Sequence, residues 1–347
     1  MKAEPPAWSR WRSAGPWRRR DRDDRQRPGR LRHWARRTAV VVVALAVSLT
    51  VASFAYNAAT SARAARPPGL LMINAGGFDT RYRSWGSTGS AIVLVPGAFE
   101  SADTFAALGA VLGRDHRVFA IDLSGTGYSR PSAPYDAAHL ADQVLAFLAA
   151  KGLTGPDAPV LVGHSSGAAV VGMAVLRASD AAAGVVFLDG DATPLGAPAL
   201  VGWLLINPYR TTMLRLALSS SWLIRELYTS QCGRACPRLS AAGVQTWRGP
   251  LEQPGFESAI TYSLRHGIPS MTSAQLAQLR AAALPKRVIV GANDPQLTLT
   301  AAAQAASRVG APPPIVVPGR HLTMVSSPQQ VAAAIGVFIG SIYPRTS

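Results

Sequence analysis

An alternation of short apolar segments with helix-like segments, from Leu70 onward, is the feature that most constrains the fold. The helix-like segments are rich in Ala and Leu, as in Ala137–Ala150 and Ala168–Ala178. Short buried strands that alternate with helices form a mainly parallel sheet covered on both faces. The sequence therefore predicts an α/β fold with a doubly wound sheet. The predicted strands are Leu70–Asn74, Ala91–Val95, Arg117–Ile121, Val160–Gly163, Gly184–Leu188, Arg287–Val290 and Ile315–Val317.

The alternation stops between Ala192 and Pro285. This segment contains the long amphipathic stretches Thr211–Thr229 and Ser273–Ala283 and has no convincing strand. It predicts a helical lid inserted after the strand that ends at Leu188. The predicted organisation is a basic disordered tail (1–37), a transmembrane helix or signal segment (38–57), the first part of the core (58–191), the lid (192–285) and the second part of the core (286–347).

The N-terminal tail carries most of the excess charge. Residues 1–37 hold 13 Lys or Arg against 4 Asp or Glu, whereas residues 38–347 hold 22 against 15. A short block of this kind is usually disordered and electrostatic in role. Although the net charge of +16 suggests a nucleic-acid partner, we expect none, because more than half of it lies on the tail.

No charged residue occurs between Thr38 and Ala62. A helix needs about 20 apolar residues to cross the hydrocarbon of a bilayer, and this stretch is just long enough. Arg36 and Arg37 precede it, and positive charge stays cytoplasmic. The sequence predicts a single span with a cytoplasmic N-terminus and an extracytoplasmic folded part. A cleaved signal, which would release a secreted protein, stays open because Ala62-Arg63-Ala64 has the small-residue spacing of a cleavage site.

The two cysteines, Cys232 and Cys236, are separated by three residues. A zinc site needs four ligands, and no nearby His or Cys supplies the others, so we expect no metal site. A disulfide that closes a short loop and a pair of free thiols are the two interpretations, and the choice depends on the compartment.

The stretch Val160-Leu161-Val162-Gly163-His164-Ser165-Ser166-Gly167-Ala168-Ala169 carries the chemistry. A strand runs into Gly-x-Ser-x-Gly and out into an Ala-rich helix, which is the pattern of a nucleophile elbow. The sharp turn lifts the hydroxyl of Ser165 above the edge of the sheet, and the helix that follows directs its free N–H groups at developing negative charge. An ordinary strand-to-helix turn with two glycines is the alternative.

A serine hydroxyl needs a base, and the base needs a carboxylate. Among the six histidines, His321 lies in a loop just after a predicted strand, where the crevice of such a sheet opens. Asp294 follows the preceding strand, and Asp189 and Asp191 are rivals at the same edge of the sheet. The order Ser165, Asp294, His321 matches the order known for this elbow.

An oxyanion hole is expected from the residue after the nucleophile and from an early loop. The stretch Val93-Leu94-Val95-Pro96-Gly97-Ala98-Phe99 supplies that loop. The predicted donors are the backbone N–H groups of Ala98 and Ser166.

Together these motifs resemble the α/β-hydrolase family over roughly Ile92–Asp191 and Lys286–Phe338. Asp122-Leu123-Ser124-Gly125-Thr126-Gly127-Tyr128-Ser129 is similar to a structural turn of that family, and the insertion lies where the family places its lid. The chain departs from the pattern at Pro96, where members commonly carry His, which leaves the geometry of the Ala98 donor open. A serine nucleophile disfavours the epoxide hydrolase and dehalogenase branches, whose nucleophile is Asp.

The resemblance implies hydrolysis of a small, apolar carboxylic ester through an acyl-enzyme, without a cofactor. Apolar lid residues either line an acyl pocket or bury the lid on the core; they are Trp203, Leu204, Leu205, Trp222, Leu223, Ile224 and Trp247. An aminopeptidase or amidase is the second possibility and would need a lid acid, for which Glu226, Glu252 and Glu257 are candidates. A membrane-anchored protein that keeps the fold without catalysis is the third.

Overall fold

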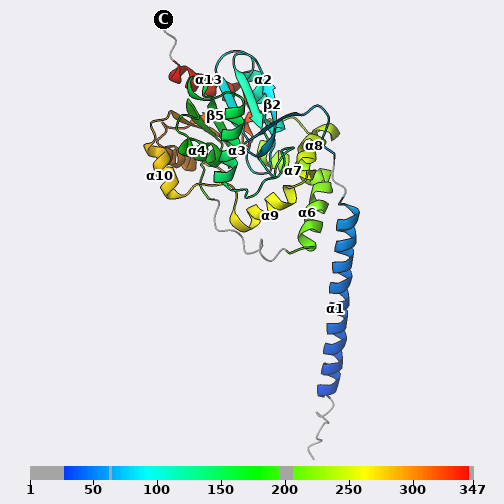
Figure 1. The fold of residues 1–347 in the computed structure, drawn as a ribbon. Coiled ribbons are helices and arrows are strands. Elements are labelled where there is room, and N and C mark those ends of the chain that lie inside the picture. Colours follow the sequence, from blue (N-terminus) through cyan, green and yellow to red (C-terminus); the bar gives the residue numbers. More distant parts are fainter. Residues whose placement is uncertain (1–26, 62–64, 195–205, 344–347) are drawn as a thin grey trace, which may run out of the picture. The chain divides into compact units, whose positions relative to one another are not determined.

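The computed structural model describes residues 27–61, 65–194 and 206–343, with side chains from residue 32 onward (Figure 1). The chain divides into two compact units, Met1–Ala55 and Tyr56–Ser347. The strands are β1 (Leu71–Ala75), β2 (Phe78–Trp85), β3 (Ala91–Val95), β4 (Arg117–Ile121), β5 (Val160–His164), β6 (Gly184–Leu188), β7 (Lys286–Gly291) and β8 (Ile315–Val317). The helices are α1 (Arg27–Ala59), α2 (Ala106–Leu112), α3 (Ala137–Ala150), α4 (Gly167–Arg177), α6 (Tyr209–Ser219), α7 (Ser221–Cys232), α8 (Ala241–Arg248), α9 (Phe256–His266), α10 (Ser273–Ala281), α11 (Leu299–Val309), α12 (Thr323–Ser326) and α13 (Pro328–Ile342).

The strands form one sheet in the order β1-β2-β4-β3-β5-β6-β7-β8. From β4 to β8 every neighbouring pair is parallel. All seven predicted strands are present, and four of them have the predicted bounds. The mainly parallel α/β sheet predicted from the alternation is therefore confirmed.

Strand β2, which the apolar pattern did not predict, pairs antiparallel with both β1 and β4. Its sequence carries Asp79, Arg81 and Arg83, so it does not read as an apolar run. Gly76 and Gly77, both with positive φ, form the two-residue connection between β1 and β2. Such a Gly-Gly pair between two extended segments is a hairpin signal, and it is the feature that could have identified this strand.

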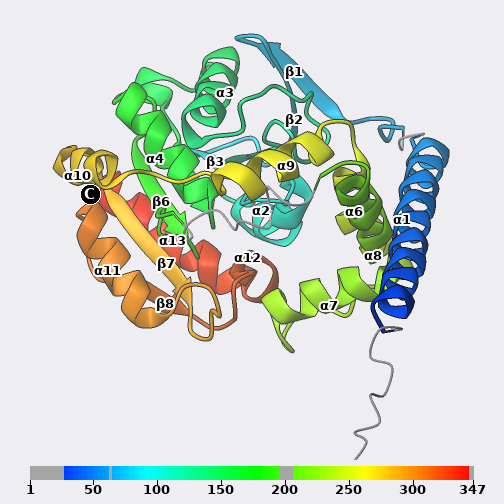
Figure 2. The same cartoon turned by 90° about the horizontal axis from the view of Figure 1, so that it is seen from below.

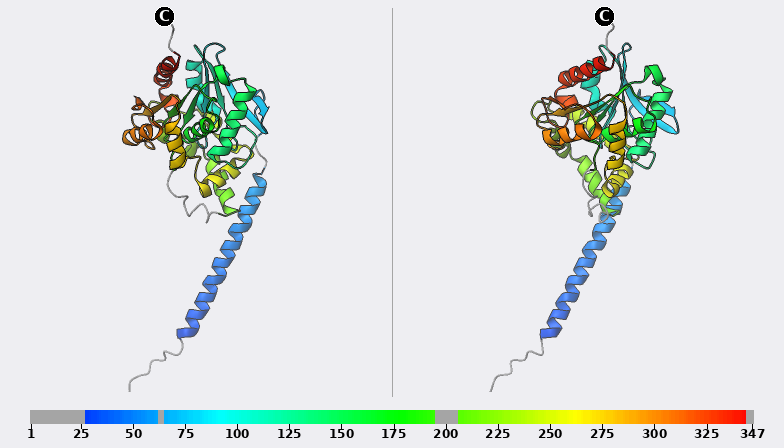
Figure 3. Two further views of the ribbon diagram at one scale, coloured as in Figure 1. Left: turned by 60° about the vertical axis from the view of Figure 1, so that its left-hand side comes forward. Right: turned by 90° about the vertical axis from the view of Figure 1, so that its left-hand side faces the viewer.

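The apolar core lies in two layers, one on each face of the sheet. Helices α3, α4 and α11 pack on one face, and α2 and α13 pack on the other (Figures 1 and 3). Alternate residues of the central strands belong to alternate layers: Val93 and Leu161 face the first, whereas Leu94 and Val162 face the second. This period of two on a sheet covered on both faces explains why β3, β5 and β6 consist almost entirely of buried residues.

Between β6 and β7, the described residues form helices α6 to α10 and no strand. The predicted helical stretch Thr211–Thr229 is two helices, because the chain breaks at Ser220. The backbone of Ser220 is extended and its side chain accepts a hydrogen bond from the N–H of Leu223, which makes it the N-cap of α7. Helix α9 lies near the viewer in the view from below (Figure 2).

One helix in the described part of the chain, Arg32–Ala59, is long and apolar enough to cross a membrane. The uncharged stretch that starts at Thr38 lies within α1, which begins at Arg27, before the predicted start at residue 38, and ends at Ala59, two residues beyond the predicted end at residue 57. Residues 27–37, predicted as part of a disordered tail, are therefore helical. A membrane span and a signal sequence both satisfy these criteria of length and composition.

Candidate active site

Strand β5 ends at His164, α4 begins at Gly167, and Ser165 occupies the turn between them. Ser165 has φ of 50°, in the left-handed region that side chains rarely adopt. The turn needs small neighbours: a methyl group at Gly167 would lie 2.6 Å from the backbone oxygens of Val95 and Pro96. The N–H of Ser165 donates to the carbonyl of Leu188 over 2.9 Å, which holds the strained residue against β6. The predicted strand, sharp turn and helix are all present.

His321, 5% exposed, lies beside Ser165 although 156 positions separate them. Its Nε2 is 3.1 Å from the Oγ of Ser165, and its Nδ1 is 2.9 Å from Oδ2 of Asp294. Because an ionised carboxylate only accepts hydrogen bonds, Nδ1 carries the hydrogen of the neutral ring. Nε2 is then free to accept the hydroxyl hydrogen of Ser165.

Asp294 comes three residues after β7 and is 6% exposed. Its Oδ1 accepts hydrogen bonds from the N–H groups of Gln296 (2.7 Å) and Leu297 (3.0 Å). The turn that follows β7 therefore holds one carboxylate oxygen, and the other faces His321. This arrangement fixes both the position of the acid and the tautomer of the ring.

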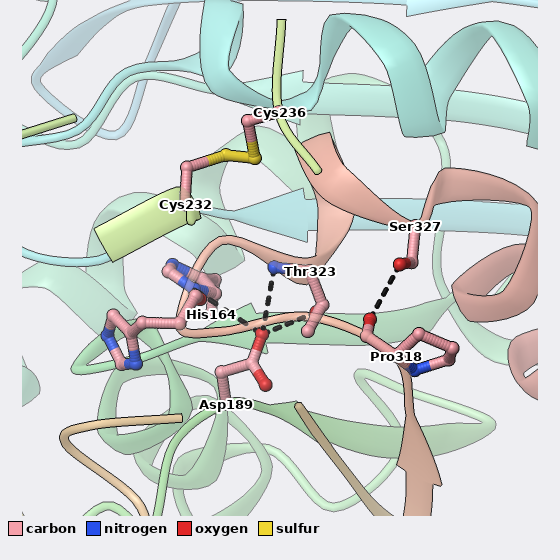
Figure 4. Close-up of a disulfide and its surroundings, with 8 residues drawn as sticks. His164, Asp189, Cys232, Cys236, Pro318, Thr323 and Ser327 are labelled. Carbon is pink, nitrogen blue, oxygen red and sulfur yellow. Dashed lines mark hydrogen bonds and ion pairs between the residues drawn. A yellow bond between two sulfur atoms is a disulfide. The ribbon is translucent and has the colours of Figure 1, made fainter. Parts of the chain in front are cut away.

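Asp189 and Asp191, the rival acids, have other partners. The buried carboxylate of Asp189 accepts from the N–H of Gly291 (2.8 Å) and from the hydroxyl and N–H of Thr323 (Figure 4). Asp191 accepts from both the N–H and the hydroxyl of Thr193. The bonds to Gly291 and Thr323 tie the end of β6 to β7 and to the first residue of α12, which is a structural arrangement.

Of the two expected oxyanion donors, Ser166 belongs to the elbow and Ala98 to the loop after β3. No hydrogen bond to the N–H of Ser166 is found within the described residues, and this N–H stands at the start of α4. The N–H of Ala98 donates to Oγ of Ser166 over 2.8 Å. Ala98 therefore contacts the elbow, and its role as an oxyanion donor stays a prediction, because a substrate oxygen would have to replace or share this hydroxyl as acceptor.

The turn that begins at Asp122 is hydrogen-bonded to the chain that follows the loop of Ala98. The fully buried carboxylate of Asp122 accepts from the N–H of Ala102 (2.6 Å) and from that of Tyr128 (2.7 Å). It also lies 3.2 Å from a guanidinium nitrogen of Arg81. Burial raises the pKa of Asp122, although the charge of Arg81 and these hydrogen bonds oppose the rise.

Sequence reasoning missed Glu100, which lies in the loop after β3 that also carries Ala98. Its Oε2 is 2.8 Å from Nδ1 of His164 and accepts the N–H of Gly97 over 3.1 Å. Nε2 of His164 lies 2.8 Å from the carbonyl oxygen of His321. The only sequence signal was a charged residue next to an otherwise apolar loop.

Two small cavities open beside the elbow. One of 80 Å³ is lined by Ser165, His321 and residues after β6. Ile268 and Pro269, from the segment between β6 and β7, also line it. The other, of 30 Å³, lies between Ala98 and α9. Phe99 of the loop after β3 packs edge-on against Phe256 of α9, with ring centroids 5.8 Å apart. Ser165 lines the first of these cavities, and its neighbour Ser166 lines both.

The apolar lid residues singled out in the sequence do not, where the structure describes them, line the cavities beside the elbow, as residues of an acyl pocket would. Ile224 is buried and Trp247 packs against Tyr228, 5.4 Å between ring centroids, whereas Trp222 is 71% exposed. Within the described residues, neither cavity is lined by Trp222, Leu223, Ile224 or Trp247. Trp203, Leu204 and Leu205 lie outside the described residues. The arrangement of Ile224 and Trp247 supports burial of the lid on the core.

Cys232 and Cys236 are joined as a disulfide at the end of α7, with Cα atoms 5.8 Å apart (Figure 4). The residue before the bridge, Gln231, accepts hydrogen bonds at its carbonyl from the N–H of His321 (2.9 Å) and of Leu322 (3.3 Å). The bridge therefore closes the turn beside the peptide that positions His321. That both cysteines are oxidised in the native compartment stays a prediction.

The described residues contain no group of three or more His, Cys, Asp or Glu side chains arranged to hold a metal ion.

Comparison with known proteins identifies the scaffold. The model of the Alpha/beta hydrolase family matches residues 92–334. The N-formylmaleamate deformylase of Pseudomonas putida is 35% identical over 98 residues, which are 28% of this chain and 35% of that protein. The chain thus matches about a third of the length of this curated relative.

Solved structures agree on the fold. A thermophilic esterase from Thermogutta terrifontis superposes with a TM-score of 0.63 at 20% identity, over 79% of this chain and 98% of the esterase. A bacterial membrane phospholipase A superposes with a TM-score of 0.62 at 17% identity, over 90% of this chain and 98% of the other. Because the family model covers more than half of the sequence and includes the elbow, the chain belongs to the alpha/beta hydrolase family.

Proposed function

We propose that the protein is a serine hydrolase that cleaves a carboxylic ester through an acyl-enzyme. The observation that carries the proposal is a pair of hydrogen-bonding contacts. Oγ of Ser165 lies 3.1 Å from Nε2 of His321, and Nδ1 of His321 lies 2.9 Å from the carboxylate of Asp294. A hydroxyl, a base and a carboxylate in this order form the constellation that activates serine in hydrolases.

In the first half of the proposed reaction, Oγ of Ser165 attacks the carbonyl carbon while His321 takes its proton on Nε2. The carbonyl oxygen becomes an anion beside the N–H of Ser166 at the positive end of α4. The carbonyl then re-forms, the bond to the alcohol oxygen breaks, and His321 returns its proton to the leaving alcohol. The acyl group remains on Ser165 as an ester.

Water completes the cycle. His321 removes a proton from a water molecule as its oxygen attacks the acyl carbon, and the same oxyanion donors hold the second tetrahedral intermediate. When this intermediate collapses, Oγ of Ser165 leaves with the proton from His321. The acid is released, and the enzyme is restored without a metal or redox step.

The cavities favour a short acyl chain. One water molecule takes about 10–15 Å³ of such a cavity, so the 80 Å³ beside Ser165 and His321 accommodates a group of only a few non-hydrogen atoms. We expect acetyl or butyryl esters to be better substrates than esters of long acyl chains.

The test compares p-nitrophenyl esters of two to sixteen carbons with amino-acid anilides, using the full chain in detergent. Ester cleavage that falls with chain length, and little anilide cleavage, is the expected result. Ser165→Ala protein prepared in the same way controls for contaminating esterases. Anilide cleavage that exceeds ester cleavage would instead establish the amidase alternative.

That alternative has one observation in its favour, the local similarity to a deformylase. The candidate lid acids give it no support. Glu257 is 2.6 Å from Nε of Arg215, Glu226 is exposed, and none of Glu226, Glu252 and Glu257 lines either cavity beside the elbow. A non-catalytic role for the fold has less support, because the side chains of Ser165, His321 and Asp294 lie within hydrogen-bonding distance of one another in that order.

We further propose that the N-terminal helix is retained as a membrane anchor. Asn57 donates from its side chain to the carbonyl of Pro208 (2.9 Å) and accepts from the hydroxyl of Thr212 (3.0 Å). Arg215 donates to the carbonyl of Asn57 (2.7 Å) and to the hydroxyl of Thr60 (3.0 Å). Cleavage after Ala64 would remove all four of these bonds to Pro208 and α6, each worth about 1 kcal/mol.

The anchor predicts a single span with the hydrolase unit outside the cytoplasm. Protease added to intact cells should remove a C-terminal tag and spare an N-terminal tag, because the basic residues before Thr38 stay inside. A mature chain that begins near Ala65 would show that the segment is a cleaved signal. Protection of both tags would show that the hydrolase unit faces the cytoplasm.

A further inference from the structure

His164 is buried completely at the end of β5, directly before the proposed nucleophile, yet both of its ring nitrogens have partners. Nδ1 lies 2.8 Å from the carboxylate of Glu100, and Nε2 lies 2.8 Å from the backbone carbonyl of His321. Carboxylate and carbonyl oxygens both accept hydrogen bonds. Satisfying both therefore requires a hydrogen on each nitrogen, so the ring is an imidazolium.

Each of these bonds reaches a different part of the site. Glu100 belongs to the loop of Ala98, where its carboxylate also accepts the N–H of Gly97. The carbonyl of His321 belongs to the peptide that carries the proposed base. The N–H of that residue is held from the other side by Gln231. His164 thus connects the loop of Ala98 to the loop of His321 through its two ring nitrogens.

We propose that His164 is a positioning residue: as an imidazolium paired with Glu100, it fixes the loop of Ala98 and the loop of His321 relative to each other. This inference rests on the proposed serine-hydrolase function and adds two residues that support it. Neither residue contacts the reacting atoms. Their effect on turnover comes from holding the oxyanion donors and the base at the spacing that the reaction requires.

The charges around His164 maintain this state at neutral pH. The groups that face its ring are Glu100, Asp189 with Oδ2 at 3.9 Å, and the ring of His321 at 5.0 Å between centroids. Burial lowers the pKa of His164, but the charge and hydrogen bond of Glu100 and the charge of Asp189 outweigh burial and raise it to about 9. Burial raises the pKa of Glu100, yet His164 reverses this and holds it below its ordinary value.

The raised pKa of His164 determines how the stability of this pair changes with pH. The paired state favours the folded arrangement fully below the ordinary histidine pKa of about 6.5 and is lost as the pH rises through about 9. Above that pH, the neutral ring keeps one hydrogen and loses its bond to either Glu100 or His321. Asp189, whose pKa burial raises to about 6, titrates on the acid side and does not produce this alkaline change.

The experiment follows the rate at which an organophosphorus p-nitrophenyl ester phosphonylates Ser165 in the full chain, from pH 6 to pH 11. Release of p-nitrophenol reports the chemical step directly. Wild type is compared with Glu100→Gln, which keeps an accepting oxygen but removes the charge. Glu226→Gln, an exposed substitution of the same type in the lid, is the matched control. Circular dichroism checks that each variant is folded.

We expect a wild-type rate that falls above a half-point near pH 9, and a half-point lower by roughly one to three pH units in Glu100→Gln. Glu226→Gln should follow wild type, and Glu100→Asp should return the half-point toward it. If Glu100→Gln does not fold, Glu100→Asp should still move the half-point, by a smaller amount in the same direction.

A wild-type rate without an alkaline fall would overturn the positioning role. A phosphonylation rate that is lower in Glu100→Gln by the same factor at every pH would also overturn it. Such a result would show that Glu100 and His164 matter for packing and not for their charge. A wild type that is not phosphonylated at all would instead refute the serine-hydrolase function itself.

Discussion

Ser165→Ala is expected to lower the turnover of a good ester by about 10⁶-fold, the loss seen when the nucleophile of a comparable triad is removed. The rest of the site keeps its arrangement. Alanine is no more strained than serine at φ of 50°, and the N–H that donates to Leu188 is unchanged. The substitution removes the hydrogen bond of 3.1 Å between the serine hydroxyl and His321. We therefore expect the free energy of unfolding to change by about 1 kcal/mol or less.

Ser166→Ala is the matched control, because it removes a hydroxyl one position away whose partner is the N–H of Ala98 and not the ring of His321. Its backbone N–H remains at the start of α4, so turnover should fall by about tenfold at most. Steady-state hydrolysis of a p-nitrophenyl ester and thermal melting measure both effects. Equal losses in the two variants, or near-complete activity in Ser165→Ala, would contradict the assignment of the nucleophile.

Asp294→Asn is expected to lower turnover by about 10⁴-fold, as the same change does in a well-studied triad. The asparagine oxygen can still accept the N–H groups of Gln296 and Leu297. Its amide group, however, donates toward Nδ1 of His321 and so places the ring hydrogen on Nε2. The base then cannot accept the proton of Ser165. We expect little change in melting temperature because the turn after β7 is preserved.

Asp189→Asn tests whether Asp294, and not Asp189, is the acid of the proposed triad. Asp189 accepts from Gly291 and Thr323, so an amide in its place removes an acceptor from a buried site. We expect a lower melting temperature, consistent with about 1–3 kcal/mol for a buried unsatisfied group, but a far smaller loss of turnover than in Asp294→Asn. The reverse ranking of the two turnovers would move the acid to the end of β6.

The sequence predicts a strand most reliably where the position of the strand in the fold leaves a simple local pattern. The apolar runs of β3 and β6 are buried on both faces, so each appears as an uninterrupted apolar segment. Strand β2 is different because Arg81 is buried within it. This guanidinium pairs with Asp103 (2.7 Å) and Asp122 (3.2 Å), which lie 22 and 41 positions further along the chain. A local pattern does not reveal such distant partners.

The site shows the same limit. Ser165, Asp294 and His321 could be proposed because each follows a predicted strand at the edge where the carboxyl ends of parallel strands meet. The partnership of His164 with Glu100 could not be proposed, because the two residues are 64 positions apart and only the folded loop after β3 brings them together. The break at Ser220 was missed for a local reason, since a single capping serine scarcely interrupts an amphipathic pattern.

The most direct test of the proposed function is covalent labelling with a serine-directed organophosphorus probe, followed by mass spectrometry of the proteolysed full chain. One adduct per chain, on Ser165 and absent from Ser165→Ala, is the predicted result, because we propose that the hydroxyl beside Nε2 of His321 is the one activated for attack. An unlabelled chain, or an adduct on any other residue with Ser165 unmodified, would contradict the proposed function.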